Sequence, residues 1–184
     1  MDPLLHLDRA LVETAPALEH HLLTAFFVLV SAWWVKGPLI VGLGLCSDLW
    51  RRRLPLAFAA AGAAVGAASL AAHVLKEAFD RERPPVVDPG LGSLASIPDN
   101  PSFPSGHSAT AFAAATAVAI VSPRLRWPAL AIAAAVAISR AYLRVHFPLD
   151  IVAGAALGAG LGALCAFVTL RLAGEALPFR TARA

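Results

Sequence analysis

Apolar stretches long enough to cross a membrane are the feature that most constrains the fold of this chain. The stretch from Leu56 to Leu75 contains no Asp, Glu, Lys or Arg. A spanning helix needs about 20 mostly apolar residues, so this stretch is long enough to cross a membrane. Across the chain 58% of the residues are hydrophobic and 15% are charged, against about 45–50% and 25% in soluble domains. A soluble fold would lack the polar residues to cover its surface, so we expect lipid to be the main solvent.

The apolar stretches predict an all-α integral membrane bundle of five to six transmembrane helices. The segment from Ala17 to Val35 is an interfacial helix or an additional span, because Lys36-Gly37-Pro38 predicts a break after it. Trp33 and Trp34 beside Lys36 resemble an interfacial anchor in either case. The other expected spans are Pro38–Trp50, Leu56–Ala78, Ser105–Val121, Trp127–Tyr142 and Ile151–Leu172.

We expect one domain over residues 1–184. Residues 1–35 form the interfacial or first transmembrane helix, 36–172 the catalytic helix bundle and 173–184 a cytoplasmic tail. The acidic residues before His21 argue against a cleavable signal peptide.

The arginines predict the orientation in the membrane. Three clusters are separated by pairs of expected spans, so they fall on one side, which the positive-inside rule makes cytoplasmic. They are Arg51-Arg52-Arg53, Arg124 with Arg126, and Arg171 with Arg180 and Arg183. This distribution explains the net charge of +3 without a nucleic-acid partner. The long proline-rich loop from Arg81 to Pro104 then lies on the opposite, extracytoplasmic side, where we expect function.

Cysteines and glycines predict packing. Cys46 and Cys165 are isolated, so we expect two small buried apolar residues and neither a disulfide nor a metal site. Glycines four residues apart allow helices to approach closely. This spacing occurs at Gly62 and Gly66, and again at Gly154, Gly158 and Gly162.

The first cluster with chemical potential is Lys76 with Arg83. Seven residues correspond to two helical turns, so both side chains can share a face, and Pro84 and Pro85 stop the helix after them. Two converging cations bind phosphate, since arginine supplies a bidentate fork and lysine a point charge. The alternative is an ordinary charged helix end.

The second cluster is Pro104-Ser105-Gly106-His107, directly before an apolar helix. Ser105 suits an N-cap, and Gly106 lets an anion approach the free N–H groups of the helix N-terminus. His107 in the first turn could protonate a leaving oxygen. The alternative is a helix cap with an incidental histidine.

The third cluster is Ser139-Arg140 followed by His146 and Asp150. The last two are four residues apart, so a helical turn brings them together, and Pro148 between them fits only a first turn. A carboxylate on one imidazole nitrogen fixes the tautomer and leaves the other nitrogen free to react. Arg140 adds a third phosphate ligand. The alternative is a satisfied histidine beside a capping aspartate.

Together the three clusters indicate phosphoryl transfer. Two histidines, a paired carboxylate and three cations describe a route through phosphohistidine, in which the cations neutralise the phosphate oxygens. We expect no cofactor, and no cluster has metal-ligand spacing.

These motifs resemble those of the type-2 phosphatidic acid phosphatase superfamily. Its signature is a Lys, six residues and Arg-Pro; then Pro-Ser-Gly-His; then Ser-Arg, five residues, His, three residues and Asp. All three parts match here, and the resemblance covers residues 50 to 172.

The resemblance implies a role for each matching residue. His146 would be the nucleophile, Asp150 would orient it, and His107 would protonate the leaving group and then activate water. The phosphate would be held by Lys76, Arg83, Arg140, Ser105 and the Gly106 N–H.

The expected function is a metal-independent lipid phosphatase or diphosphatase in a bacterial inner membrane, with its active site on the periplasmic or extracytoplasmic face. Expected substrates are undecaprenyl diphosphate, which the short chain favours slightly, phosphatidylglycerol phosphate, phosphatidic acid or a lipid A phosphate. A lipid phosphotransferase and a non-catalytic anion channel or transporter stay open. The related vanadate haloperoxidases are soluble, so the apolar spans argue against them. The oligomeric state is open.

Overall fold

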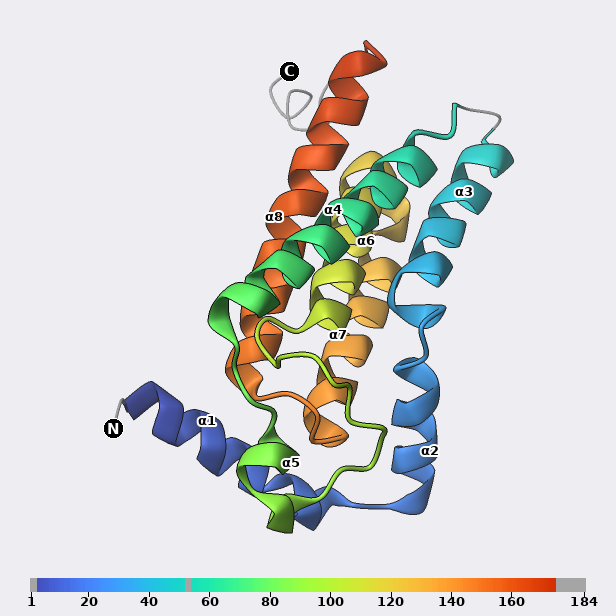
Figure 1. Ribbon diagram of the computed structural model, residues 1–184. Helices are drawn as coiled ribbons and strands as arrows, with labels where there is room; N and C mark the ends of the chain where they lie inside the picture. The colour runs from blue at the N-terminus through green and yellow to red at the C-terminus, as the bar shows by residue number, and fades with distance from the viewer. Residues whose placement is uncertain (1–2, 52–53, 175–184) are drawn as a thin grey trace.

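The computed structural model describes residues 3–51 and 54–174, and every regular element in these ranges is helical. The expected all-α class is therefore confirmed (Figure 1). The longer helices are α1 (Pro3–Glu13), α2 (His21–Val30), α3 (Ile40–Trp50), α4 (Leu56–Phe79), α6 (Gly106–Val121), α7 (Arg126–Tyr142) and α8 (Pro148–Leu172). The bounds of α3, α4, α6, α7 and α8 agree with the expected spans to within three residues. Helix α2 is shorter than the expected segment Ala17–Val35, by four residues at its start and five at its end.

Short elements connect these helices. A π-helical turn, η2 (Val35–Leu39), precedes α3, and α5 (Pro84–Val87) follows α4. Three 3₁₀ turns lie in the connections, and they are η1 (Ala15–Leu18), η3 (Pro89–Leu91) and η4 (Pro123–Leu125).

Helix α6 is the centre of the bundle, and α4, α7 and α8 pack around it. Its buried side chains are mostly alanines, including Ala109, Ala113 and Ala117, which are fully buried. Alanine and glycine allow helix axes to approach closely, so dispersion contacts between backbones contribute to the packing.

The glycines of α8 sit where this approach is closest. A Cβ atom at Gly154 would overlap the backbone oxygen of Ser105, the N-cap of α6, and a Cβ at Gly158 or Gly162 would overlap that of Ala109 or Ala113 in α6, respectively. The expected close contact is confirmed for this set. It is wrong for Gly62 and Gly66, because a Cβ at either position meets nothing within 4 Å. Both point away from neighbouring helices of the chain.

Two described segments are long and apolar enough to cross a membrane, Leu56–Val87 and Pro148–Leu172. Helix α2 and the segment Val35–Trp50 are together long and apolar enough to cross as one broken span, with a bend of 65° between them. Helix α6 has 16 residues, or roughly 24 Å at 1.5 Å per residue, which is shorter than a hydrocarbon core of about 30 Å. The count of five to six spans therefore stays a prediction.

The break between α2 and α3 occurs at the predicted residues. Pro38 lies inside η2 and has no N–H to donate, so regular α-helical hydrogen bonding is interrupted there. Gly37 is buried, and a Cβ on it would lie 3.4 Å from Val65 of α4. The break is thus packed against the bundle. Trp33 and Trp34 are exposed, as an interfacial anchor requires.

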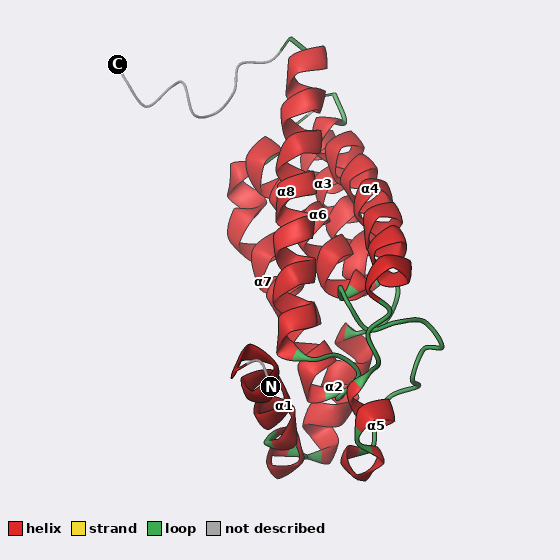
Figure 2. Cartoon of the chain, turned by 60° about the vertical axis from the view of Figure 1, so that its left-hand side comes forward, coloured by secondary structure: helices red, strands yellow, loops and turns green. Residues whose placement is uncertain are grey.

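The two ends of the bundle differ in composition. One end carries the α3–α4 connection, η4 and the end of α8, and the opposite end carries α1, α5, the loop 88–105 and the α7–α8 turn (Figures 1 and 2). The described arginines of the three clusters, Arg51, Arg124, Arg126 and Arg171, belong to the first end. Arg52, Arg53, Arg180, Arg183 and most of the expected tail lie outside the described residues.

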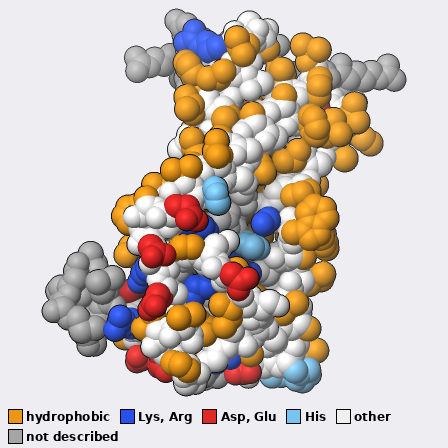
Figure 3. All heavy atoms as spheres, in the orientation of Figure 1, with side chains coloured by type: hydrophobic (Ala, Val, Ile, Leu, Met, Phe, Trp, Pro, Cys, Tyr) orange, Lys and Arg blue, Asp and Glu red, His pale blue; other side chains and the backbone are white. Residues whose placement is uncertain are grey.

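The face in Figure 3 is apolar along the upper half, while charged side chains gather over the lower half. Cys46 is exposed and Cys165 is partly buried, and both are free thiols. The expectation that both cysteines are buried is therefore wrong. Cys46 lies on an outer face of α3, because an apolar side chain in a membrane bundle can face lipid as well as the core.

Candidate active site

A cavity of about 330 Å³ opens at the polar end of the bundle, where α4, α6 and α7 meet the break before α3. It contains most of the residues singled out from the sequence. Those on its lining are Lys76, Arg83, Gly106, His107, Arg140 and His146. The remaining two, Ser105 and Asp150, are fully buried behind it.

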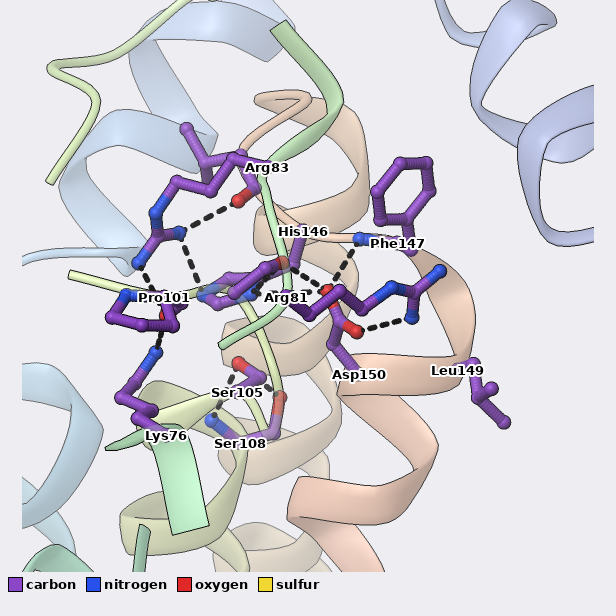
Figure 4. A network of polar contacts seen from close by, with 12 residues as sticks. Lys76, Arg81, Arg83, Pro101, Ser105, Ser108, His146, Phe147, Leu149 and Asp150 are labelled. Carbon is purple, nitrogen blue, oxygen red and sulfur yellow. Dashed lines mark hydrogen bonds and ion pairs between the residues drawn. The ribbon is translucent and has the colours of Figure 1, made fainter. Parts of the chain in front are cut away.

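His146 and Asp150 form the expected pair. His146 follows the α7–α8 turn, and Pro148 occupies the first turn of α8, so Asp150 lies at its third position. The distance from His146 Nδ1 to Asp150 Oδ2 is 3.5 Å. The Phe147 N–H donates to the same carboxylate oxygen at 3.0 Å, which fixes the carboxylate at the helix start (Figure 4).

The other nitrogen of His146 faces a cation. Arg83 Nη1 lies 3.3 Å from His146 Nε2, and because a guanidinium can only donate, Nε2 must present its lone pair. The proton therefore sits on Nδ1, toward Asp150. Burial lowers the pKa of His146 to about 4, and the hydrogen bond to Asp150 offsets this effect only in part. The imidazole is thus neutral near pH 7, as a nucleophile must be.

Ser105 caps α6 as predicted, with its side chain accepting from the Ser108 N–H. Its hydroxyl also accepts from Ser108 Oγ at 3.1 Å. The hydroxyl is therefore engaged inside the protein, and Ser105 does not line the cavity. Gly106 and His107 do line it, in the first turn of α6. A bare Gly106 leaves the helix N-terminus accessible to an anion.

Lys76 and Arg83 both reach the cavity, but the reason given from the sequence is wrong. Helix α4 ends at Phe79 because Asp80 adopts a left-handed conformation with φ 40°, so Arg83 is not two turns further along it. Instead the extended segment after Asp80 brings Arg83 back to the site. Lys76 Nζ donates to the Pro101 oxygen and Arg83 Nε to the Asn100 oxygen, the latter at 3.0 Å.

Arg140 enters the cavity from the last turn of α7. Its Nη1 donates to Ser31 Oγ, at the end of α2. Its Nε is buried and has no hydrogen-bond partner among the described residues. A buried donor without a partner is costly, so a ligand oxygen at this place would be favourable.

Several residues of this site were not found from the sequence. Ser102 donates its hydroxyl proton to Asp150 Oδ2 and lies 3.4 Å from His146 Nδ1. Arg81 Nη1 donates to Asp150 Oδ1 at 2.5 Å (Figure 4). Both residues lie in the proline-rich loop from Arg81 to Pro104. The length and composition of that loop predicted a functional role for it, but no sequence signal singled out these two residues. Asn100, Lys36 and His73 also line the cavity.

Comparison with known proteins identifies the family of this chain. The family model described as the PAP2 superfamily matches residues 55–172, a segment that contains all the predicted site residues. The chain belongs to the PAP2 superfamily. The resemblance seen in the motifs is thereby confirmed, and membrane phosphatase relatives together with the apolar helices indicate an integral membrane protein.

Two curated relatives show the range of the family. The lipid A 1-phosphatase of Rhizobium johnstonii is 39% identical over 106 residues, which are 55% of this chain and 43% of that protein. The decaprenylphosphoryl-5-phosphoribose phosphatase of Mycobacterium tuberculosis is 36% identical over 132 residues, 70% of this chain and 69% of that protein. The chain thus spans less than half the length of the Rhizobium relative.

Two solved structures share the fold. The PAP2 type phosphatidylglycerolphosphate phosphatase from Bacillus subtilis has a TM-score of 0.72 and 26% identity, with 98% of this chain and 90% of that chain covered. Aquifex aeolicus LpxE has a TM-score of 0.65 and 24% identity, with 91% and 94% covered.

Proposed function

We propose that this protein is a membrane lipid phosphatase that works through a phosphohistidine at His146. The proposal rests on the different partners of the two ring nitrogens of His146. Nε2 presents a lone pair 3.3 Å from Arg83, a phosphate-binding cation, and Nδ1 faces Asp150. This is the arrangement of an activated nucleophile held beside a phosphoryl group.

In the first step, His146 Nε2 attacks phosphorus and the bond from phosphorus to the leaving oxygen breaks. His107 donates a proton to that oxygen as it departs. The positive charge that develops on the His146 ring is stabilised by Asp150. Lys76, Arg83 and Arg140 neutralise the phosphate oxygens, so the residues themselves supply the charge that a metal ion supplies elsewhere.

In the second step, water attacks phosphorus and the bond from phosphorus to Nε2 breaks. His107, now neutral, accepts a proton from the water, and inorganic phosphate leaves. Replacing water by a lipid hydroxyl in this step would make the protein a phosphotransferase, which is the alternative that the same site allows.

The relatives support a phosphorylated lipid as substrate. Their names cover a lipid A phosphate, a decaprenyl phosphoribose and phosphatidylglycerol phosphate. We propose the same class here: undecaprenyl diphosphate, phosphatidylglycerol phosphate, phosphatidic acid or a lipid A phosphate. The test is phosphate release from each lipid by detergent-purified protein, with and without a chelator. Unchanged release with the chelator is expected of a metal-independent enzyme.

The covalent step needs its own experiment. With His107→Ala, hydrolysis of the intermediate should slow, so labelled phosphate should accumulate on the protein as an alkali-stable, acid-labile adduct. The adduct should vanish when His146→Gln is added, and persist with His21→Gln, an exposed histidine on α2. Phosphate release without any trapped adduct at His146 would overturn the covalent route.

We also propose that the cavity faces the extracytoplasmic side of a bacterial inner membrane. In a Cys46→Ala, Cys165→Ala background, Ser96→Cys in the loop 88–105 should react with an impermeant thiol reagent in intact cells. Arg124→Cys, at the opposite end of the bundle, should react only after lysis. The reverse pattern would invert the orientation.

A further inference from the structure

Four cations line the cavity, and the three motifs account for only three of them. Lys76, Arg83 and Arg140 belong to the motifs, whereas Lys36 comes from the break before α3. No described aspartate or glutamate lines the cavity with them. A cavity whose described lining has four positive groups and no carboxylate suits more negative charge than one phosphate group carries.

Lys36 is held in place by its neighbours. Val35 and Gly37 on either side of it are buried, and Pro38 fixes the backbone that follows. Gly37 packs against Val65 of α4. A lysine on a solvated surface helix moves freely, but here the backbone of Lys36 is fixed against the bundle, so its side chain is directed into the cavity.

The same break also positions Arg140. Ser31 Oγ, just after α2, accepts a hydrogen bond from Arg140 Nη1. The segment between α2 and α3 therefore supplies both Ser31, which holds Arg140, and Lys36, which lines the cavity. The charge of Lys36 is repelled by that of Arg140. Among the described residues no hydrogen bond or ion pair compensates Lys36. An anion between them would remove the repulsion.

Helix α4 completes this part of the cavity. Ser69 and His73 are four residues apart, and Lys76 is three residues further, so all three lie along one helix face that lines the cavity. His73 is therefore one turn from a phosphate-binding lysine, and its imidazole can donate to an oxygen of a bound anion.

We propose that Lys36 and His73 form a second anion-binding subsite, which takes a second phosphate of the lipid headgroup while the first phosphate is bound at His146. This subsite rests on the proposed function. The second phosphate either is joined directly to the first, as in a lipid diphosphate, or is carried elsewhere on the headgroup. Lys36 is then a specificity-determining residue, and none of the three motifs contains it.

The kinetic test compares substrates with the same polyprenyl tail, one a diphosphate and one a monophosphate. Lys36→Gln should lower kcat/KM for the diphosphate roughly tenfold, the loss expected for one charge-assisted hydrogen bond, and change that for the monophosphate little. Lys36→Arg should restore most of the loss. Arg124→Gln removes one exposed positive charge at the opposite end and should affect neither substrate. Equal losses on both substrates would overturn the subsite. The absence of any loss on these two lipids would also overturn it, unless Lys36→Gln selectively impairs a lipid whose second phosphate lies elsewhere on the headgroup.

A lipid with its second phosphate elsewhere on the headgroup, such as a bisphosphorylated lipid A, forms the other arm. Selective loss on this lipid alone, with no loss on the diphosphate, assigns the subsite to the remote phosphate. Selective loss on the diphosphate assigns it to the adjacent one.

A binding measurement keeps the subsite separate from the proposed activity. Inorganic diphosphate should raise the unfolding midpoint of the detergent-solubilised protein more than inorganic phosphate does, and Lys36→Gln should abolish the difference. This result would support the subsite even if the protein hydrolysed no lipid. A failure to hydrolyse any lipid would defeat the proposed phosphatase activity and not the subsite. Identical stabilisation of the unsubstituted protein by the two anions, together with no selective effect of Lys36→Gln on the bisphosphorylated lipid, would defeat the subsite alone.

Discussion

Arg81 and Asp8 form an ion pair with 2.5 Å between Nη2 and Oδ2, and it joins the N-terminal helix α1 to the active site. The other arm of the guanidinium donates to Asp150 at 2.5 Å. Asp8 Oδ1 in turn accepts from the Leu149 N–H at 2.8 Å, and Asp8 is nearly fully buried. Helix α1 therefore braces the carboxylate that orients His146.

Loss of the ion pair between Asp8 and Arg81 should reduce turnover. Asp8→Asn removes the charge that holds Arg81, which would weaken the protein by about 1.5–3 kcal/mol, the value of a hydrogen bond to a charged group. We expect kcat to fall several-fold with KM nearly unchanged, because no phosphate contact is lost. Steady-state kinetics and thermal unfolding in detergent check this. Asp99→Asn, an exposed aspartate in the loop 88–105, is the control. A rise in KM without a fall in kcat would contradict the role of Asp8.

Ser102 should matter for the same carboxylate. Ser102→Ala removes the hydroxyl that donates to Asp150 Oδ2 and lies beside His146 Nδ1. We expect roughly a tenfold lower kcat, since one buried hydrogen bond to a charged group is lost. The exposed Ser96→Ala in the same loop should be silent. If both variants retain full activity, Ser102 does not position the pair.

The protonation of His146 predicts a pH dependence of stability. Its pKa in the folded protein is about 4, against about 6.5 when unfolded. The unfolded chain therefore binds the extra proton between these values, and stability should fall as the pH drops from 6.5 to 4, by on the order of 3 kcal/mol. His146→Gln, which cannot titrate, should show a smaller loss over the same range. Parallel curves for the two proteins would contradict this.

The same pKa places the acid limit of the nucleophile. Neutral His146 is lost only as the pH falls through about 4, so the rate of phosphoenzyme formation should not decline near 6.5 on account of this residue. Rapid-quench trapping with a substrate of known phosphate pKa measures it. A decline that follows protonation of the enzyme near pH 6.5, once substrate protonation is allowed for, would contradict a neutral, buried His146.

Close packing of α6 and α8 predicts a sharp contrast between two glycines. Gly158→Ala would drive a Cβ into the Ala109 backbone oxygen, whereas Gly160→Ala on the same helix meets nothing within 4 Å. Overpacking of this kind costs about 1–3 kcal/mol or more, so the first variant should unfold at a clearly lower temperature. The second should be neutral or slightly stabilising, because alanine favours helix. Equal midpoints would show that the helices can shift apart.

Much of this protein was determined by its sequence alone. Helix positions followed from apolar length, because a chain in lipid must satisfy its backbone hydrogen bonds within helices. Lys76, Arg83, Gly106, His107, Arg140 and His146 were all predicted, since phosphoryl transfer requires these residue types and their spacing is local to each motif. Ser105 and Asp150 were predicted as well and lie directly behind the cavity.

Tertiary structure alone decided the rest. Arg83 reaches the cavity from the extended segment that follows the left-handed residue Asp80, not along a helix face. The contacts of Asp150 with Ser102 and Arg81 span 48 and 69 residues, and that of Arg81 with Asp8 spans 73. No local periodicity encodes such contacts. They depend on the close packing of α6 and α8, which Gly154, Gly158 and Gly162 allow because they have no Cβ. The same spacing at Gly62 and Gly66 produces no such contact, so the spacing by itself did not decide which helices pack closely.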